Sequence, residues 1–239
     1  MQVALFFAII LNMRDIGEAF SFPFKDPNWL AKMVVGTIFA AFCVLLIGFP
    51  VVCGYYIELI QRMRRHEQYP LPEWKDVGVK FIVGFKYIVV LVIYNLPTAV
   101  ILIPALFLLV VANLHHGGLS EMVAGTGFAM IIILLVLPYS LFIAALKPII
   151  AARFSERESI GDALDVGEVL RLFKSHWRDA CLAMLLAIGV QILASVGIIF
   201  SLVGIFATSF YGYLVASHLY GQIARTIDDS RPSPAPSAI

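Results

Sequence analysis

The sequence predicts an all-α integral membrane protein, and three observations lead to this prediction. Of its 239 residues, 61% are hydrophobic and only 14% are charged, little more than half the charged fraction of a soluble domain. The 17 Lys and Arg residues are clustered, so residues 33–61, 87–146 and 179–224 contain none of them. A transmembrane helix needs about 20 apolar residues, and each of these stretches is longer than that.

The two longer stretches each hold two membrane crossings joined by a loop. We expect these crossings at about 84–112 and 121–150, and at about 179–200 and 203–224. Both pairs begin and end in basic segments, whereas the loops between their crossings contain no Lys or Arg. The positive-inside rule therefore places the basic segments in the cytoplasm and the two loops outside the cell membrane.

The stretch 33–61 is long for one crossing and short for two. The basic segments before and after it are both predicted to be cytoplasmic, which requires an even number of crossings. Proline ends or kinks a helix, so Gly48-Phe49-Pro50 is expected to form a turn between crossings at about 31–48 and 50–65. This gives six crossings in three hairpins, with both termini in the cytoplasm. A single kinked crossing, with five in total and the N-terminus outside, is the alternative.

An amphipathic segment precedes each hairpin, and its sequence partly recurs. Residues 16–20, Ile-Gly-Glu-Ala-Phe, resemble residues 160–164, Ile-Gly-Asp-Ala-Leu. The best-defined segment is 159–177, where Ser159 is suited to accept a hydrogen bond from the first helical turn. Apolar residues follow at steps of three and four, on one helical face: Ile160, Ala163, Leu164, Gly167, Leu170, Phe173 and Trp177. We expect this helix to lie along the cytoplasmic membrane surface; binding to a partner is the alternative.

The two ends of the chain differ from the membrane domain at 13–225. Residues 1–12 are apolar but too short to cross, and they lack the basic start of a signal peptide. They are interpreted as sequence upstream of the true start at Met13, or as a segment lying in the interface. Residues 226–239 contain three prolines and two adjacent aspartates, and we expect a disordered cytoplasmic tail there.

Four polar residues within the predicted crossings are candidate functional residues: Glu58, Asn95, Gln191 and His218. Burying such groups in lipid without a partner is costly. In a transporter they would line a path, and Glu58 or His218 would exchange protons. In the alternative, Asn95 and Gln191 form hydrogen bonds between helices, while Glu58 and His218 reach the cytoplasmic interface.

The sequence contains no motif for enzymatic, metal or cofactor chemistry. It lacks a nucleophile–base motif, a phosphate-binding glycine loop and a zinc motif. The three cysteines, Cys43, Cys53 and Cys181, have no Cys-x-x-Cys spacing. The pair His115-His116 with Glu121 fits a solvated polar turn better than a metal site. A net charge of +1 excludes the extended basic surface of a nucleic-acid-binding protein.

Several motifs occur in an order that resembles a known family. They are Ser21–Trp29 (SFPFKDPNW), Gly54-Tyr55, the Arg62–Arg65 cluster, Leu71–Asp76 (LPEWKD) and the segment Gly212–Gln222. Together they resemble the domain of unknown function 4013 family of uncharacterised prokaryotic membrane proteins, over residues 14–225. The layout is more distantly similar to the membrane domain attached to some glycerophosphodiester phosphodiesterases, although no phosphodiesterase domain is present. The resemblance implies a polytopic prokaryotic membrane protein and brings no catalytic residues.

We therefore expect a non-enzymatic accessory or scaffold protein that packs in the lipid bilayer with other membrane proteins or with copies of itself. Gly189, Gly197 and Gly204 recur at steps of seven or eight residues and are expected to allow close helix packing in the last hairpin or between subunits. A small transporter or permease is the alternative function.

Overall fold

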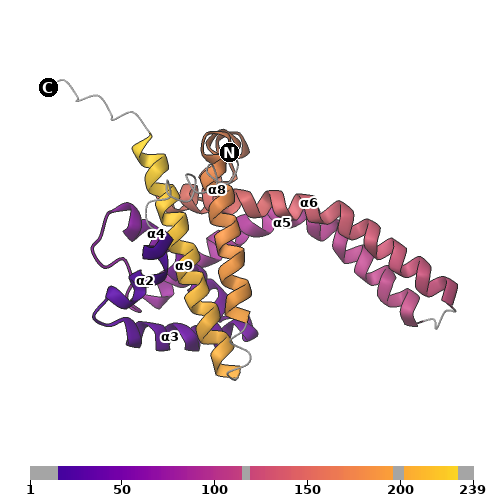
Figure 1. Ribbon diagram of the computed structural model, residues 1–239, viewed down its shortest axis with the longest axis horizontal. Helices are drawn as coiled ribbons and strands as arrows, with labels where there is room; N and C mark the ends of the chain where they lie inside the picture. Colours follow the sequence, from indigo (N-terminus) through magenta and orange to yellow (C-terminus); the bar gives the residue numbers. More distant parts are fainter. Residues whose placement is uncertain (1–15, 115–118, 196–201, 231–239) are drawn as a thin grey trace. The chain divides into compact units, whose positions relative to one another are not determined.

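The computed structural model describes residues 16–114, 119–195 and 202–230, and every regular element within them is a helix (Figure 1). The helices are α2 (Ile16–Lys25), α3 (Trp29–Phe42), η1 (Cys43–Leu45), α4 (Gly48–Arg64), α5 (Val77–Leu114), α6 (Leu119–Arg157), α7 (Ile160–Leu164), α8 (Val166–Ser195) and α9 (Leu202–Asp229). The predicted all-α fold class is confirmed for this part of the chain. Residues 1–12 lie outside it.

Three of these helices are long and apolar enough to cross a membrane. They contain the segments Val77–Phe107, Gly127–Arg157 and Val166–Ser195. The pair α2 and α3, bent by 101°, adds a fourth if it is counted as one broken span. The protein is therefore a helical membrane protein by length and composition, and the count of six crossings remains a prediction.

Residues 31–65 form two helices, but the turn between them is not at Gly48–Pro50. The chain turns at Leu46, which has a left-handed backbone (φ 62°), and its N–H donates to the carbonyl of Cys43 at 2.9 Å. Pro50 lies instead in the first turn of α4, where a helix has no need of its missing N–H. A methyl group on Gly48 would overlap the backbone of α3 at Phe39, so the two helices meet closely at this turn.

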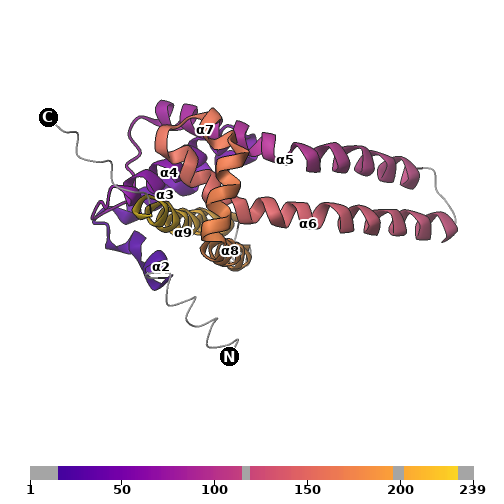
Figure 2. The ribbon, with the colours of Figure 1, turned by 90° about the horizontal axis from the view of Figure 1, so that it is seen from above.

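The described chain divides into two compact units. One contains residues 1–89 and 146–239, and the other contains residues 90–145 of α5 and α6. In the first unit α9 packs against α2, α3, α4 and α8, and Figure 2 shows it among these helices. The core of this unit includes Phe22, Ala40, Val52, Tyr55, Leu59, Leu71, Phe210 and Leu214. Helix α9 therefore supplies the centre of the first unit.

Close helix contacts are made at glycines other than those expected from the sequence. A methyl group on Gly189 would have no atom within 4 Å, so this residue makes no close contact within the chain, and Gly197 lies outside the described residues. Packing between subunits at Gly189 stays a prediction. Among the glycines that the structure describes, the tightest contacts join α4 and α5. A methyl group on Gly54 would overlap the backbone carbonyl of Lys80, and one on Gly84 would overlap that of Pro50.

The predicted amphipathic helix 159–177 is broken into two. The N-terminal cap is confirmed, because the Asp162 N–H donates to Oγ of Ser159 at 3.3 Å. The helix then stops at Asp165 (φ −68°, ψ 84°), and Asp165 caps α8 by accepting from the N–H of Glu168 at 3.1 Å. A second change of direction occurs inside α8 at His176 (φ −121°, ψ 25°).

These breaks change which residues of the segment are buried. In α7 the predicted face is partly correct, since Ala163 is buried. In the part of α8 that belongs to this segment, the buried residues are Val169 and Leu172, whereas Trp177 is 51% exposed. The single continuous face predicted to run as far as Trp177 is therefore wrong, because the helix register restarts after Asp165.

Helix α9 extends further than the sequence indicated. It runs to Asp229, so residues 226–229, part of the tail expected to be disordered, are helical. The Asp228 carboxylate accepts two hydrogen bonds from the guanidinium of Arg64, at 2.7 and 2.5 Å. This contact fixes the last turn of α9 to the end of α4. Residues 231–239 lie outside the described part of the chain.

Candidate functional site

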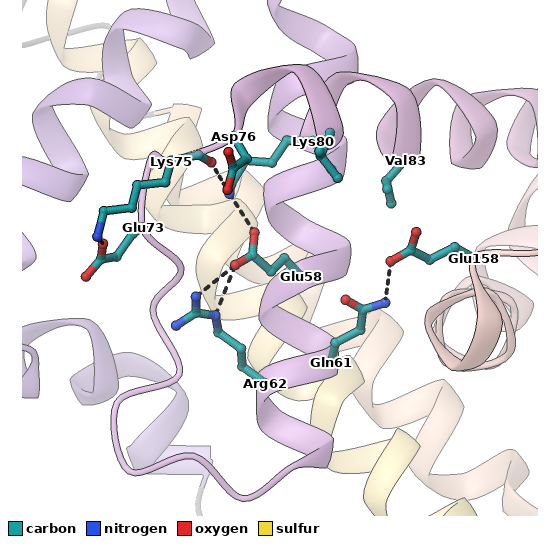
Figure 3. Close-up of a pocket in the computed structure, with 11 residues that line it drawn as sticks. Glu58, Gln61, Arg62, Glu73, Lys75, Asp76, Lys80, Val83 and Glu158 are labelled. Atoms are coloured by element: carbon teal, nitrogen blue, oxygen red, sulfur yellow. Dashed lines mark hydrogen bonds and ion pairs between the residues drawn. The ribbon is translucent and has the colours of Figure 1, made fainter.

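The first unit contains a cavity of about 530 Å³ with a largely charged lining (Figure 3). Helix α4 contributes four lining residues and the start of α5 contributes three. The segment between these helices supplies three more, and one follows α6. The lining residues are Gly54, Glu58, Gln61, Arg62, Glu73, Lys75, Asp76, Val79, Lys80, Val83 and Glu158. Gly54, Glu58, Gln61 and Arg62 occur at helical steps, which brings them to one face of α4.

Glu58 is shared by two cations at the centre of this cavity. Its Oε1 accepts from Nε and Nη2 of Arg62 at 3.1 and 2.9 Å, one helical turn further along α4. Its Oε2 lies 2.7 Å from Nζ of Lys80, and Figure 3 shows the carboxylate between the two cations. Lys80 is buried, and its ammonium group also donates to the carbonyl of Lys75 at 2.8 Å. These partners compensate the cost of burying the charge.

The rest of the cavity lining carries two acids with an unusual backbone. Asp76 and Glu158 both have positive φ, 53° in each case, a conformation that costs energy for residues other than glycine. The Oε1 of Glu158 accepts from Nε2 of Gln61 at 2.9 Å. Such conformations persist only where the surrounding structure holds them in place. Here the chain turns at both residues, directly before α5 and directly after α6.

A more exposed ion pair lies at the edge of the cavity. Nζ of Lys75 is 2.6 Å from Oε2 of Glu73. This hydrogen bond holds the pKa of the Glu73 carboxyl below its ordinary value and raises the pKa of Lys75. The eleven lining residues include carboxylate, amide, ammonium and guanidinium groups, but no hydroxyl, thiol or imidazole. The cavity lining therefore presents both hydrogen-bond donors and hydrogen-bond acceptors.

Of the four polar residues singled out from the sequence, only Glu58 lines this cavity. Its pairing with Arg62 and Lys80 joins it to the basic segment that the sequence places at the cytoplasmic edge. Asn95 belongs to the other unit, where its Nδ2 donates to the carbonyl of Leu91 at 2.7 Å, within its own helix. This contact is not the hydrogen bond between helices expected for Asn95.

Gln191 and His218 both contact neighbouring helices. A methyl group on Gly212 of α9 would lie 2.6 Å from Oε1 of Gln191, so the Gln191 side chain packs closely on α9. His218 is only 3% exposed, and its ring stacks on Phe22 of α2 with 4.5 Å between ring centres. Its Nδ1 lies 3.3 Å from Nε2 of Gln222.

Candidate metal ligands do not come together in the described chain. Within residues 16–114, 119–195 and 202–230, no three His, Cys, Asp or Glu side chains are grouped so that they could hold a metal ion. The pair His115-His116 lies outside these residues, and the side chain of Glu121 is not described.

Comparison with known proteins assigns the chain to a family. The family model described as a protein of unknown function (DUF4013) matches residues 37–216, about three quarters of the chain. The chain belongs to the DUF4013 family. The matched range is shorter than the range 14–225 over which the sequence motifs show the resemblance. No curated protein and no solved structure matches the chain.

The DUF4013 range contains the whole charged cavity, and it also contains a segment whose role was not evident from the sequence. The backbone carbonyl of Leu71 accepts from Nζ of Lys32 at 2.9 Å, and that of Pro72 accepts from the Tyr55 hydroxyl at 2.9 Å. Next to them, Trp74 donates from Nε1 to the carbonyl of Lys32 at 2.8 Å. The Leu71–Trp74 segment is thus fixed to both α3 and α4.

The indole ring of Trp74 lies between aromatic rings from both helices. It stacks on Tyr55 of α4 with 4.3 Å between ring centres and on Phe39 of α3 with 5.0 Å. Phe210 of α9 adds a tilted contact at 5.9 Å. The motif Leu71–Asp76 (LPEWKD) is part of the family resemblance, but nothing local in the sequence identifies Tyr55 and Phe39 as partners of its tryptophan.

Proposed function

We propose that this DUF4013 protein is a non-enzymatic accessory or scaffold component of a prokaryotic cell membrane, which packs with other membrane proteins or with copies of itself. The observation that carries this proposal is an apolar groove in the unit formed by residues 90–145. The groove has a volume of about 400 Å³. Its lining residues are Leu102, Ala105, Leu106, Phe128, Ala129, Ile132, Ile133, Val136, Leu137 and Ser140.

A groove of this kind favours helix packing for a physical reason. Lipid tails are as apolar as the helices, so association inside a membrane depends on van der Waals packing. Small residues such as Ala105 and Ala129 allow the side chains of another helix to approach the α5 and α6 backbones. The surrounding surface is also apolar, with Ile103, Met130 and Leu134 each more than 60% exposed.

Filling the groove tests this proposal. Ala129→Phe places a large ring in the groove, whereas Met130→Phe changes the next residue, which is 67% exposed and does not line the groove. We expect Ala129→Phe to reduce recovery of the associated form by about tenfold or more, and Met130→Phe to leave it unchanged. The measurement is purification in mild detergent, followed by mass determination and identification of stoichiometric partners.

A monomeric wild-type protein without partners would contradict the scaffold proposal. An equal loss of association in both variants would show that the groove is not the contact surface. The melting temperature of each variant, measured in the same detergent, separates loss of association from loss of folding.

The topology proposed for this function has six crossings, with both termini in the cytoplasm. In this topology α3, α4 and α9 each cross the membrane once, in addition to the three long apolar helices α5, α6 and α8. A reporter fused after Glu67 is expected to lie in the cytoplasm, and one after His116 outside, because only the first position adjoins basic residues. A tag before Met13 distinguishes the alternatives. An external tag would reject six crossings in favour of five.

The transporter alternative has less support. It requires polar side chains around one wet path, and of its four residues only Glu58 lines the charged cavity. The Glu58 carboxylate is already occupied by Arg62 and Lys80, as in a structural ion-pair network. Its pairing supplies no free group for moving a substrate or a proton.

A further inference from the structure

A second polar cavity, of about 360 Å³, lies where the ends of α4 and α6 meet. Six residues line it: Gln61, Arg64, Arg65, Ser155, Glu156 and Arg157. Three of them are arginines and one is an acid, so this lining is positively charged, unlike that of the first cavity. The two cavities share Gln61.

One of the three arginines, Arg64, is bonded to other residues of the protein through all three nitrogens of its guanidinium group. Besides its two bonds to Asp228, Arg64 donates from Nη1 to the carbonyl of Ala152 at 3.1 Å and to Oγ of Ser155 at 3.2 Å. Its Nη2 also lies 3.3 Å from Oε1 of Glu156. With 14% of its side chain exposed, Arg64 ties the ends of α4, α6 and α9 together and is not available to a ligand.

The acid in the lining is neutralised as well. Glu156 pairs through Oε1 with Arg64 and through Oε2 with Nη1 of Arg153, at 2.7 Å. Arg64, Arg153, Glu156 and Asp228 form a set of two positive and two negative charges. The charges of these four residues sum to zero, so they do not offset the charge of the two remaining arginines in the lining.

Arg65 and Arg157 supply that remaining charge. Both are exposed, and neither side chain forms an ion pair or hydrogen bond with another residue in the described chain. They come from different helices, Arg65 directly after α4 and Arg157 at the last position of α6. Two unpaired guanidinium groups thus border one cavity whose other polar groups already have partners.

We infer that the Arg65–Arg157 cavity binds a phosphate group. Guanidinium groups form paired, charge-assisted hydrogen bonds with phosphate oxygens, and two of them match a singly or doubly charged anion. The basic segments that contain these arginines are predicted to lie at the cytoplasmic membrane surface. The phosphate therefore comes either from an anionic phospholipid headgroup or from a soluble phosphate compound.

Thermal stabilisation of the detergent-purified protein tests this inference. The three probes are phosphatidylglycerol, glycerol 3-phosphate and phosphatidylcholine. The variant Arg65→Gln/Arg157→Gln removes both unpaired guanidinium groups. The control Arg171→Gln/Lys174→Gln removes the same charge from exposed positions of α8 that do not line the cavity.

We expect an anionic probe to raise the melting temperature of the wild type and of the control. The Arg65/Arg157 variant should bind that probe about tenfold or more weakly, with an unchanged melting temperature in its absence, because both side chains are exposed. Stabilisation by phosphatidylglycerol alone identifies a lipid headgroup, and stabilisation by glycerol 3-phosphate identifies a soluble ligand.

Two outcomes would overturn the inference. One is equal binding of the anionic probes by the wild type and the Arg65/Arg157 variant. The other is an equal loss of binding in the control variant, which would indicate attraction by net charge alone. In either case the two arginines serve only to complement the negative C-terminal ends of α4 and α6. Neither outcome depends on the groove at Ala129, so this test is independent of the scaffold proposal.

Discussion

Gly54→Ala is expected to lower the free energy of unfolding by about 3 kcal/mol, although it adds only one methyl group. That methyl would overlap the backbone carbonyl of Lys80 in α5. A backbone cannot rotate away as a side chain can, so α4 and α5 must move apart. The movement would also disturb the ion pair between Glu58 and Lys80, because Lys80 forms the contact and Glu58 lies one helical turn from Gly54.

Gly78→Ala is the matched control for this prediction. Gly78 lies in the first turn of α5, and a methyl group there has no atom within 4 Å. Alanine favours helix more than glycine does, by up to about 1 kcal/mol, so this variant should be as stable as the wild type or more stable. The measurement is unfolding by SDS in mixed micelles. Similar stability of both variants would show that α4 and α5 do not meet at Gly54.

Trp74→Ala is expected to cost about 3–5 kcal/mol, the range for removal of a large packed aromatic side chain. The change removes the stacking on Tyr55 and Phe39 and leaves the Lys32 carbonyl without its indole donor. The ring contacts both α3 and α4, so its removal should also detach the segment between α4 and α5 from these two helices. Limited proteolysis is expected to cut residues 65–76 faster in this variant.

Trp177→Ala supplies the control for Trp74. Trp177 is 51% exposed, and the guanidinium of Arg178 lies 5.5 Å from its ring centre. Its loss should change the stability of the protein by about 1 kcal/mol or less. If both tryptophan variants unfolded alike and resisted protease alike, the Leu71–Trp74 segment would not be the clamp between α3 and α4.

The helices themselves could be predicted because their signal is local. Long stretches without Lys or Arg are required for burial in lipid, and they correctly indicated the paired helices α5–α6 and α8–α9. The cap at Ser159 was predictable for the same reason, since the serine and the N–H that it accepts are three residues apart. The chain turn at Leu46 was not, because leucine rarely has a left-handed backbone and Pro50 gave a stronger but misleading signal.

The candidate sites depend on contacts between residues far apart in the sequence. Glu58 is recognisable in the sequence as an isolated acid in an apolar stretch, but its partner Lys80 lies 22 residues further on, in the next helix. Arg64 belonged to a basic cluster of similar residues, and only the fold separates it from Arg65. Arg64 is held by Asp228, 164 residues away, whereas Arg65 has no partner among the described residues. No local pattern distinguishes these two arginines.

The central place of α9 has a consequence for how the protein is made. The first unit needs Phe210 and Leu214 for its core and Asp228 for the guanidinium of Arg64, and these residues are synthesised after the rest of the unit. Until then α2, α3 and α4 lack the helix against which they pack, and Arg64 lacks the carboxylate of Asp228. Folding of this unit therefore cannot be completed before α9 is synthesised, and a chain truncated before α9 cannot reach this fold.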